Sequence, residues 1–359
     1  MMSDDDTHNS ALTKNIINNI KPNETVGADV IIEQGKAKAN LDVFSSTLQE
    51  LAQHDRDIIV VTSDSRGSGK LAPFGQKFPS QHIEVGIAEQ NLVGVAAGLA
   101  SCGKKVFAVS PACFLTARAL EQIKNDVAYS DNPVKVIGIS AGVSYGALGS
   151  THHSLHDFAV LRAINNIIVV APADNFETEQ AIELASKTNQ PVYLRFGKKP
   201  MSSLKEVNDD VFEFGKGRVI TEGNDVAIIA TGETVYPALQ AAKKLKEKNI
   251  AATVVSMHTI KPLDTALLKT IAEKCKAIVT VEEHSVYGGL GEACASWLLQ
   301  NTFNHGSAEA LSFGGVWKGL FRIIGIPDEY TVTGSQQDIF DHYGISEKGI
   351  ADVVFGLLK

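Results

Sequence analysis

The chain has 359 residues, 44% of them hydrophobic and 21% charged, which is typical of a folded protein with two domains. A formal net charge of −8 without a basic stripe argues against nucleic-acid binding. No apolar run is long enough to span a membrane, and the acidic N-terminus is unlike a signal peptide. The four cysteines lack CxxC spacing and lie in apolar surroundings, so we expect reduced thiols in a cytoplasmic protein.

Residues 1–27 are expected to form an acidic tail and a short helix, followed by a first domain at 28–197. Short β-branched runs and helical segments alternate through that domain. The expected strands are 58–62, 106–109, 134–139, 167–170 and 192–196. The expected helices are 38–53, 92–100, 114–129, 155–164 and 176–186. This alternation predicts a doubly wound α/β domain with a parallel sheet, in which ligands bind at the loops after the strands.

A polar segment at 198–214 is expected to link this domain to a smaller α/β domain at 215–359. The expected strands of this second domain are 226–230, 253–256, 277–281 and 321–324. Its expected helices are 236–246, 265–273 and 291–299. The run Gly288–Gly291 opens the last of these helices. It either cradles a phosphate or allows close packing at a helix start, and it lacks the GxGxxG spacing of a dinucleotide site.

Glu89 precedes a helical segment in which residues 92–100 carry no charge. A helix that is apolar on all sides must be buried, and Gly94 and Gly98, one turn apart, allow another backbone to approach closely. An ionised carboxylate at the edge of such a segment needs a hydrogen-bonding partner. Glu89 therefore either binds backbone N–H groups at the helix entry or exchanges a proton with a ligand.

Three histidines, His152, His153 and His156, occur in or beside the loop after an expected strand. They could bind a metal, relay protons to a substrate, or cap the loop. The segment lacks the HExxH helix of many zinc enzymes, so a polar cleft is the stronger of the functional interpretations.

Two further loops after strands carry aromatic or charged side chains. Phe114 and Arg118 lie at the start of an expected helix, and Asp64 and Arg66 lie in a loop rich in glycine and serine. A lone phenylalanine is usually a core residue, and an arginine in such a helix usually pairs with an acid. An arginine among glycines also suits an anionic ligand, because its fork is bidentate and free N–H groups surround it.

Together these motifs resemble the C-terminal half of transketolases, which depend on thiamine diphosphate. The run GIAEQNLVGVAAGLA, residues 86–100, is similar to the segment that carries the family's cofactor-activating glutamate. Further similar segments, in the family's order, are Phe114 with 118–123, 150–152, 170–174, 260–264 and 282–291. The resemblance implies a pyrimidine-binding domain followed by the family's C-terminal domain.

The resemblance also implies a role for each matching residue. Glu89 would bind N1′ of the aminopyrimidine ring and activate the coenzyme, and His152 would bind the substrate and take part in catalysis. The residues assigned to the cofactor are Asp64, Glu89 and Phe114. Those assigned to the substrate are Arg66, His152, His153 and Arg195. No residue of this chain is expected to bind a metal.

Full-length family members carry an N-terminal domain in which a GDG motif and an asparagine hold Mg²⁺ and the diphosphate, and no GDG occurs in this sequence. The resemblance therefore implies the C-terminal subunit of a split transketolase, which is inactive alone. A separate N-terminal subunit would hold the Mg²⁺ and the diphosphate of thiamine diphosphate. A heterotetramer with two copies of each subunit is expected.

Departures from the family's pattern bear on the substrate. Leu148 stands in place of an acid that reads sugar hydroxyls, and Ser140 in place of a phosphate-binding histidine. Because Arg66 and His153 look like replacements, we expect a donor ketose with an unusual anionic tail, such as a branched sugar phosphate or a sulfonated sugar, and an aldose phosphate acceptor. The alternatives are a 1-deoxyxylulose-5-phosphate synthase-like enzyme, the β subunit of a 2-oxo acid dehydrogenase, and a catalytically silent assembly subunit.

Overall fold

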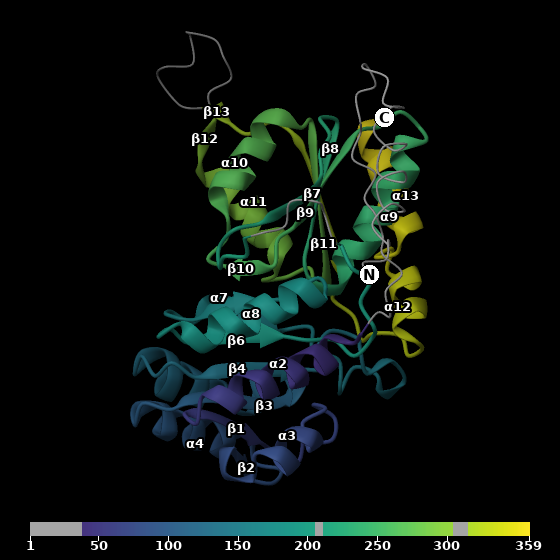
Figure 1. Ribbon diagram of the computed structural model, residues 1–359. Coiled ribbons are helices and arrows are strands. Elements are labelled where there is room, and N and C mark those ends of the chain that lie inside the picture. The colour runs from purple at the N-terminus through teal and green to yellow at the C-terminus, as the bar shows by residue number, and fades with distance from the viewer. Residues whose placement is uncertain (1–37, 205–210, 304–314) are drawn as a thin grey trace, which may run out of the picture. The chain divides into compact units, whose positions relative to one another are not determined.

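A computed structural model describes residues 38–204, 211–303 and 315–359 (Figure 1). The tail and short helix expected in residues 1–27, and the first residues of the expected first domain, lie outside this described part. No helix within the described part is long and apolar enough to cross a membrane.

A seven-stranded sheet forms the core of the first domain. Its strands are β1 (Ile58–Thr62), β2 (His82–Glu84), β3 (Lys105–Pro111), β4 (Lys135–Ile139), β5 (Ile168–Val170), β6 (Val192–Arg195) and β10 (Thr259–Lys261). The order across the sheet is β10-β5-β6-β4-β3-β1-β2. All neighbours are parallel except β10, which runs antiparallel to β5 and comes from the second half of the chain.

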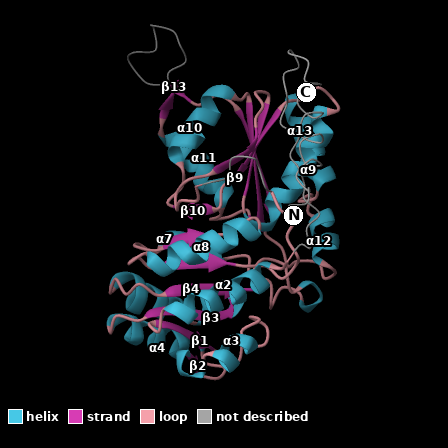
Figure 2. Ribbon diagram, in the orientation of Figure 1, coloured by secondary structure: helices cyan, strands magenta, loops and turns pink. Residues whose placement is uncertain are grey.

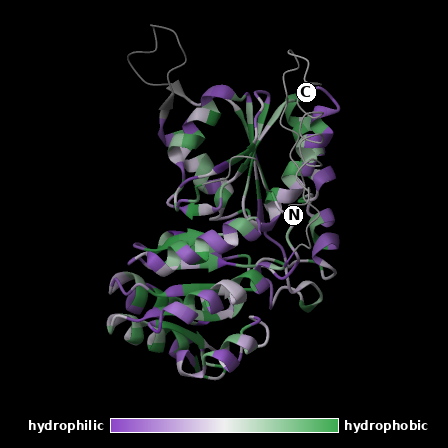
Figure 3. Cartoon of the chain, viewed as in Figure 1, coloured by the Kyte–Doolittle hydropathy of each residue, from purple (hydrophilic) through white to green (hydrophobic). Residues whose placement is uncertain are grey.

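Helices cover both faces of this sheet, as Figure 2 shows. They are α2 (Asn40–His54), α3 (Ala72–Lys77), α4 (Glu89–Ser101), α5 (Ala112–Arg118), α6 (Leu120–Gln122), α7 (Asp157–Ala163) and α8 (Asn175–Lys187). Alternate strand residues face two separate cores. Val60 and Phe107 pack with α2, α3 and α8, whereas Val61 and Ala108 pack with α4, α5 and α7. Burial on both faces explains why the strands are apolar throughout (Figure 3).

The second domain contains a five-stranded sheet in the order β14-β11-β8-β9-β7. The strands are β7 (Arg218–Thr221), β8 (Val226–Ala230), β9 (Ala252–Ser256), β11 (Ala277–Ser285) and β14 (Leu320–Ile326), and only β7 is antiparallel to its neighbour. Helices α9 (Val235–Lys246) and α13 (Glu347–Leu358) lie on one face, and α10 (Thr265–Lys274) and α11 (Leu290–Gln300) lie on the other (Figure 1). Helix α12 (Gln336–His342) precedes α13, and β12 (Thr302–Phe303) pairs with β13 (Gly315–Val316).

The prediction of two α/β domains built on parallel sheets is therefore confirmed, with an antiparallel edge strand in each sheet. The three-residue strands β2 and β10 were not predicted, because so short a run shows no clear periodicity. The single helix expected at 114–129 is divided into α5, α6 and the π-helix η3 (Ile123–Tyr129), with a break at Ala119. The loop expected after β1 contains α3 and the short 3₁₀ turn η2 (Pro79–Gln81). Two further 3₁₀ turns, η4 (Gly146–Leu148) and η5 (Gly232–Thr234), lie in loops.

Candidate active site

The sheet order brings most of the predicted site loops to one edge. Strands β4, β3, β1 and β2 are successive neighbours and parallel, so the segments after them meet at their carboxyl ends. Glu89 follows β2, Phe114 follows β3 and His152 follows β4. Asp64 and Arg66 follow β1.

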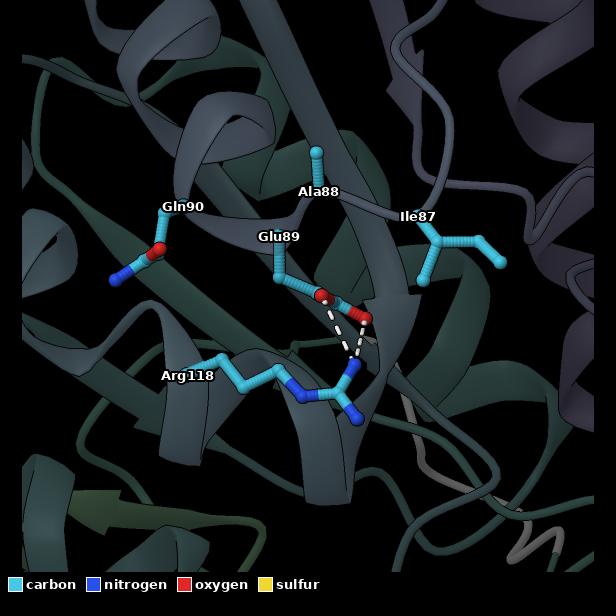
Figure 4. Close-up of a pocket in the computed structure, with 5 residues that line it drawn as sticks. All are labelled: Ile87, Ala88, Glu89, Gln90 and Arg118. Carbon is cyan, nitrogen blue, oxygen red and sulfur yellow. Dashed lines mark hydrogen bonds and ion pairs between the residues drawn. The ribbon is translucent and has the colours of Figure 1, made fainter.

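Glu89 is the first residue of α4 and is only 4% exposed. Its two carboxylate oxygens both accept hydrogen bonds from Nη1 of Arg118, at 3.1 and 3.2 Å (Figure 4). The helix N-terminus further favours a negative charge at this position. An open pocket of about 410 Å³ lies beside the pair and is lined by Ile87, Ala88, Glu89, Gln90 and Arg118. A buried carboxylate can therefore be reached from outside.

Aromatic rings continue from Arg118 toward the histidine-rich loop. The guanidinium of Arg118 lies 4.4 Å from the centre of the Phe114 ring. The ring of His152 stands edge-on to Phe114, with 5.4 Å between ring centres, and also meets Tyr145 at 5.5 Å. Nζ of Lys198 lies 4.6 Å from the centre of the Tyr145 ring, which sequence reasoning missed. These contacts join Glu89, Phe114 and His152 into one site.

The arrangement at Glu89 fits an aminopyrimidine ring. The planar guanidinium of Arg118 already donates to the Glu89 carboxylate while lying over Phe114. A flat heterocycle that carries an N–H group has the same two requirements, a hydrogen-bond acceptor at its edge and an aromatic surface to pack on. Arg118 is half-exposed and can move aside for such a ring.

Asp64 and Arg66 are both exposed, in a separate cluster around Glu84. The backbone N–H of Asp64 donates to Oε1 of Glu84 at 2.7 Å, and the Arg66 charge lies close enough to His82 to lower the pKa of that imidazole, after the larger effect of burial. No hydrogen bond or ion pair in the described part of the chain links either residue to Glu89 or His152.

His153 and Arg195 are buried, at 4% and 6% exposure. His153 bonds to the Thr331 hydroxyl and to the carbonyl oxygen of Gly146. Nε of Arg195 donates to Asp157 at 2.8 Å, and Nη2 donates to the carbonyl oxygen of Glu283 at 2.7 Å. Their expected contact with substrate does not fit this placement, because their polar atoms face protein groups.

A cluster of buried acids at the domain junction was not singled out by sequence reasoning. Nε2 of Gln336 donates to Glu233 at 2.5 Å and to Glu283 at 2.6 Å, and Glu283 also accepts from the Val143 N–H at 2.9 Å. Burial and the neighbouring Glu283 raise the pKa of Glu233 to about 8. Burial also raises the pKa of Glu283. The only sequence signal was the presence of acids within an otherwise apolar strand.

The other two motifs have structural explanations. The N–H groups of Leu290 and Gly291 donate to the carboxylate of Glu282, at 2.7 and 2.9 Å, so an internal acid occupies the start of α11. A Cβ atom at Gly289 would lie 1.8 Å from that carboxylate, which is why close packing requires glycine there. The three histidines diverge, and His156 meets Thr116. Across residues 38–204, 211–303 and 315–359, no group of three metal-ligating side chains gathers.

Comparison with known families agrees with this geometry. Residues 36–202 match the family described as "Transketolase, pyrimidine binding domain", and residues 215–350 match "Transketolase, C-terminal domain". One of the two subunits of an apulose-4-phosphate transketolase from Phocaeicola vulgatus is 46% identical over 88% of this chain and 96% of its own length. A 6-deoxy-6-sulfo-D-fructose transketolase subunit of a Clostridium species is 37% identical over 72% of this chain and 80% of its own length.

Among solved structures, a "Split gene transketolase, inactive beta4 tetramer" superposes with a TM-score of 0.76 at 35% identity, covering 89% of this chain and 98% of that one. The 1-deoxy-D-xylulose-5-phosphate synthase of Halothermothrix orenii is 33% identical, but the chain spans only 50% of it. The chain thus belongs to the transketolase family, whose members depend on thiamine diphosphate. Within this family it is the C-terminal subunit of a split transketolase, because it covers nearly the full length of the subunit relatives.

Proposed function

We propose that this subunit takes part in the transfer of a two-carbon ketol unit from a branched ketose phosphate, apulose 4-phosphate, to an aldose phosphate. The observation that carries the proposal is the contact row from Glu89 through Arg118 and Phe114 to His152. The 46% identity to a transketolase subunit named for apulose 4-phosphate supports this choice of donor. A sulfonated ketose is the second candidate, because a 37% identical relative is named for 6-deoxy-6-sulfo-D-fructose.

The reaction breaks the bond between C2 and C3 of the ketose and forms a new bond to the aldehyde carbon of the acceptor, so no oxidant is needed. Bound thiamine diphosphate supplies the nucleophilic carbon that carries the two-carbon unit. Glu89 shares a proton with N1′ of the aminopyrimidine ring, and Phe114 packs against that ring. His152, beside Phe114, hydrogen-bonds to substrate oxygens and moves a proton to or from them.

Recognition of the anionic end of the donor is assigned to exposed cations near these loops. Lys198 lies over Tyr145, which contacts His152, and Arg66 is exposed on the loop after β1. Arg66 and Asp64 also remain candidates for the outer part of the site. His153 and Arg195 are given structural roles, since both are buried and hydrogen-bonded to protein groups.

A separate N-terminal subunit is proposed to bind Mg²⁺ and the diphosphate, so that the coenzyme lies between the two polypeptides. The apulose-4-phosphate relative is itself one subunit of its enzyme, which supports a partner for this chain. The split-gene relative forms a tetramer of beta chains that is described as inactive, which supports inactivity without the partner. We propose a heterotetramer with two copies of each subunit. A cytoplasmic location agrees with the four cysteines, all of which are free thiols.

The proposal is tested on the complex purified through a tag on this chain, with thiamine diphosphate and Mg²⁺ added. Apulose 4-phosphate and glyceraldehyde 3-phosphate should yield two-carbon transfer, and this chain alone should yield none. Lys198→Met should raise the KM for apulose 4-phosphate about tenfold through loss of a charge contact, whereas Lys248→Met, at an exposed site on the second domain, should not.

Pyruvate separates the alternatives. A 1-deoxyxylulose-5-phosphate synthase or a 2-oxo acid dehydrogenase would release CO₂ from it, whereas a transketolase would not. Release of CO₂ from pyruvate without two-carbon transfer from either ketose would overturn the proposal. A complex inactive on all three substrates would point instead to a silent assembly subunit.

A further inference from the structure

The loop Gly142–Ser154, here called the histidine loop, is held from the second domain. Thr331, which lies between β14 and α12 and is 7% exposed, touches it at two points. Its hydroxyl oxygen lies 2.5 Å from Nδ1 of His153 and 3.0 Å from the hydroxyl of Ser150. His153 in turn reaches back within the loop, with Nε2 3.0 Å from the carbonyl oxygen of Gly146. A single hydroxyl therefore joins two residues that flank His152.

The direction of every hydrogen bond in this chain of contacts is fixed by chemistry. The carbonyl oxygen of Gly146 can only accept, so Nε2 of His153 carries the proton. Burial lowers the pKa of His153, which keeps its imidazole neutral and leaves Nδ1 as an acceptor. Thr331 must then donate its hydroxyl proton to Nδ1, and Ser150 donates to Thr331. Because the Thr331 hydroxyl both donates and accepts, only serine can replace it here without breaking a bond.

The rest of the histidine loop has little room to adjust. Gly146 has φ +48°, and a Cβ atom there would lie 2.5 Å from the carbonyl oxygen of Gly334. At the start of the loop, the Val143 N–H donates to Glu283. The ring of His152 lies between Phe114 and Tyr145. A shift of His153 and Ser150 would thus be passed to His152 rather than absorbed elsewhere.

We propose that Thr331 is a positioning residue that orients His152 toward the donor sugar, and that the C-terminal domain thereby contributes to substrate binding. The inference rests on the proposed function, because it needs His152 to contact the sugar. It requires no contact between Thr331 and either substrate or coenzyme.

The test compares three variants in the assembled complex, with apulose 4-phosphate as the donor. Thr331→Val keeps the shape of the side chain but cannot donate to His153, and it should raise the KM for the donor about tenfold. The apparent affinity for thiamine diphosphate should stay unchanged, because Glu89 and Phe114 are not touched. Thr331→Ser should restore the KM, and Thr270→Val, on the exposed surface of α10, should leave it unchanged.

A donor KM for Thr331→Val equal to that of the unmodified complex would overturn the inference, as would an equal loss of affinity for donor and coenzyme. If Thr331→Val fails to fold, Ser150→Ala decides the matter, since it removes only the outer donor of the chain of contacts and should raise the donor KM about threefold. An unchanged donor KM in Ser150→Ala would then overturn the inference. Failure of the proposed function is recognised separately, by an unmodified complex that transfers no two-carbon unit.

Discussion

Arg118 and Arg195 each pair with a buried carboxylate, but their surroundings are opposite. In the Arg118–Glu89 pair, the side chain of the arginine is 51% exposed and that of the acid 5% exposed, and Nη1 alone contacts both oxygens. In the Arg195–Asp157 pair the exposures are 5% and 0%. Arg195 also donates to the carbonyl oxygens of Ser154 and Glu283, and Tyr193 donates to Asp157 at 2.7 Å.

The difference shows how one interaction serves two purposes. A half-exposed arginine loses little when a ligand takes its place, so the Arg118–Glu89 pair keeps an acid satisfied until a planar ring arrives. A fully buried pair cannot be opened without stranding a charge, so the Arg195–Asp157 pair fixes the fold. Burial and additional partners, and not the ion pair itself, decide between a binding site and a structural joint.

The strongest test of the open pair is Glu89→Gln. An amide cannot share a proton with the aminopyrimidine, so two-carbon transfer by the complex should fall by a factor of about 10² to 10⁴. The measurement is kcat with saturating coenzyme, and Glu50→Gln on the exposed face of α2 is the matched control. Retention of more than about a tenth of the activity would show that Glu89 is a structural acid only.

The closed pair is tested by Arg195→Met, which leaves Asp157 buried without its cation. The free energy of unfolding of the subunit should fall by about 3–5 kcal/mol, measured by urea denaturation. A fall of less than about 1 kcal/mol would mean that Asp157 is satisfied by Tyr193 alone.

The pH dependence of stability tests the acids beside the closed pair. The pKa of Glu233, raised to about 8 in the folded protein, exceeds that of an unfolded glutamate. The folded state therefore binds the extra proton, and stability falls as pH rises, by about 1 kcal/mol between pH 7 and 8. Glu233→Gln imitates the protonated acid and should flatten this fall in a plot of Tm against pH. His284, whose pKa is lowered by burial to about 4, titrates below this window.

The smallest effect is expected for Arg118→Met. Because the arginine is half-exposed, the free energy of unfolding of the free subunit should change by less than about 1 kcal/mol. Calorimetric titration of the complex with thiamine diphosphate should show affinity no weaker than before, since the coenzyme displaces Arg118. Weaker coenzyme binding would contradict the idea that the two compete for Glu89.

Much of the fold follows from local patterns. The expected strands at 58–62 and 226–230 agree with β1 and β8, because continuous β-branched runs bounded by polar turns leave few alternatives. Strand β11 continues four residues beyond its predicted end, through Glu282, Glu283 and His284. Charged residues normally end a buried strand, and the partners that permit their burial here lie in other parts of the chain.

The candidate site was predictable where parallel topology alone determines proximity. Glu89, Phe114 and His152 each follow one of three strands at one side of the sheet, so their meeting follows from the alternation of strands and helices. The burial of His153 and Arg195 could not be foreseen, because it depends on Thr331 and Glu283 in the second domain. Sequence identifies residues with the right chemistry more readily than it identifies which of them face the ligand.

Strand β10 has a consequence for how the polypeptide can be divided. It pairs with β5 at the border of the first sheet, where Thr259 lies opposite Val170. A fragment that stopped before residue 215 would leave the hydrogen-bonding groups of Val169 and Val170 open to any passing strand, and unprotected borders of this kind promote aggregation. The halves of this chain should consequently be produced and evolve as one piece, even in a family that tolerates a cut farther upstream.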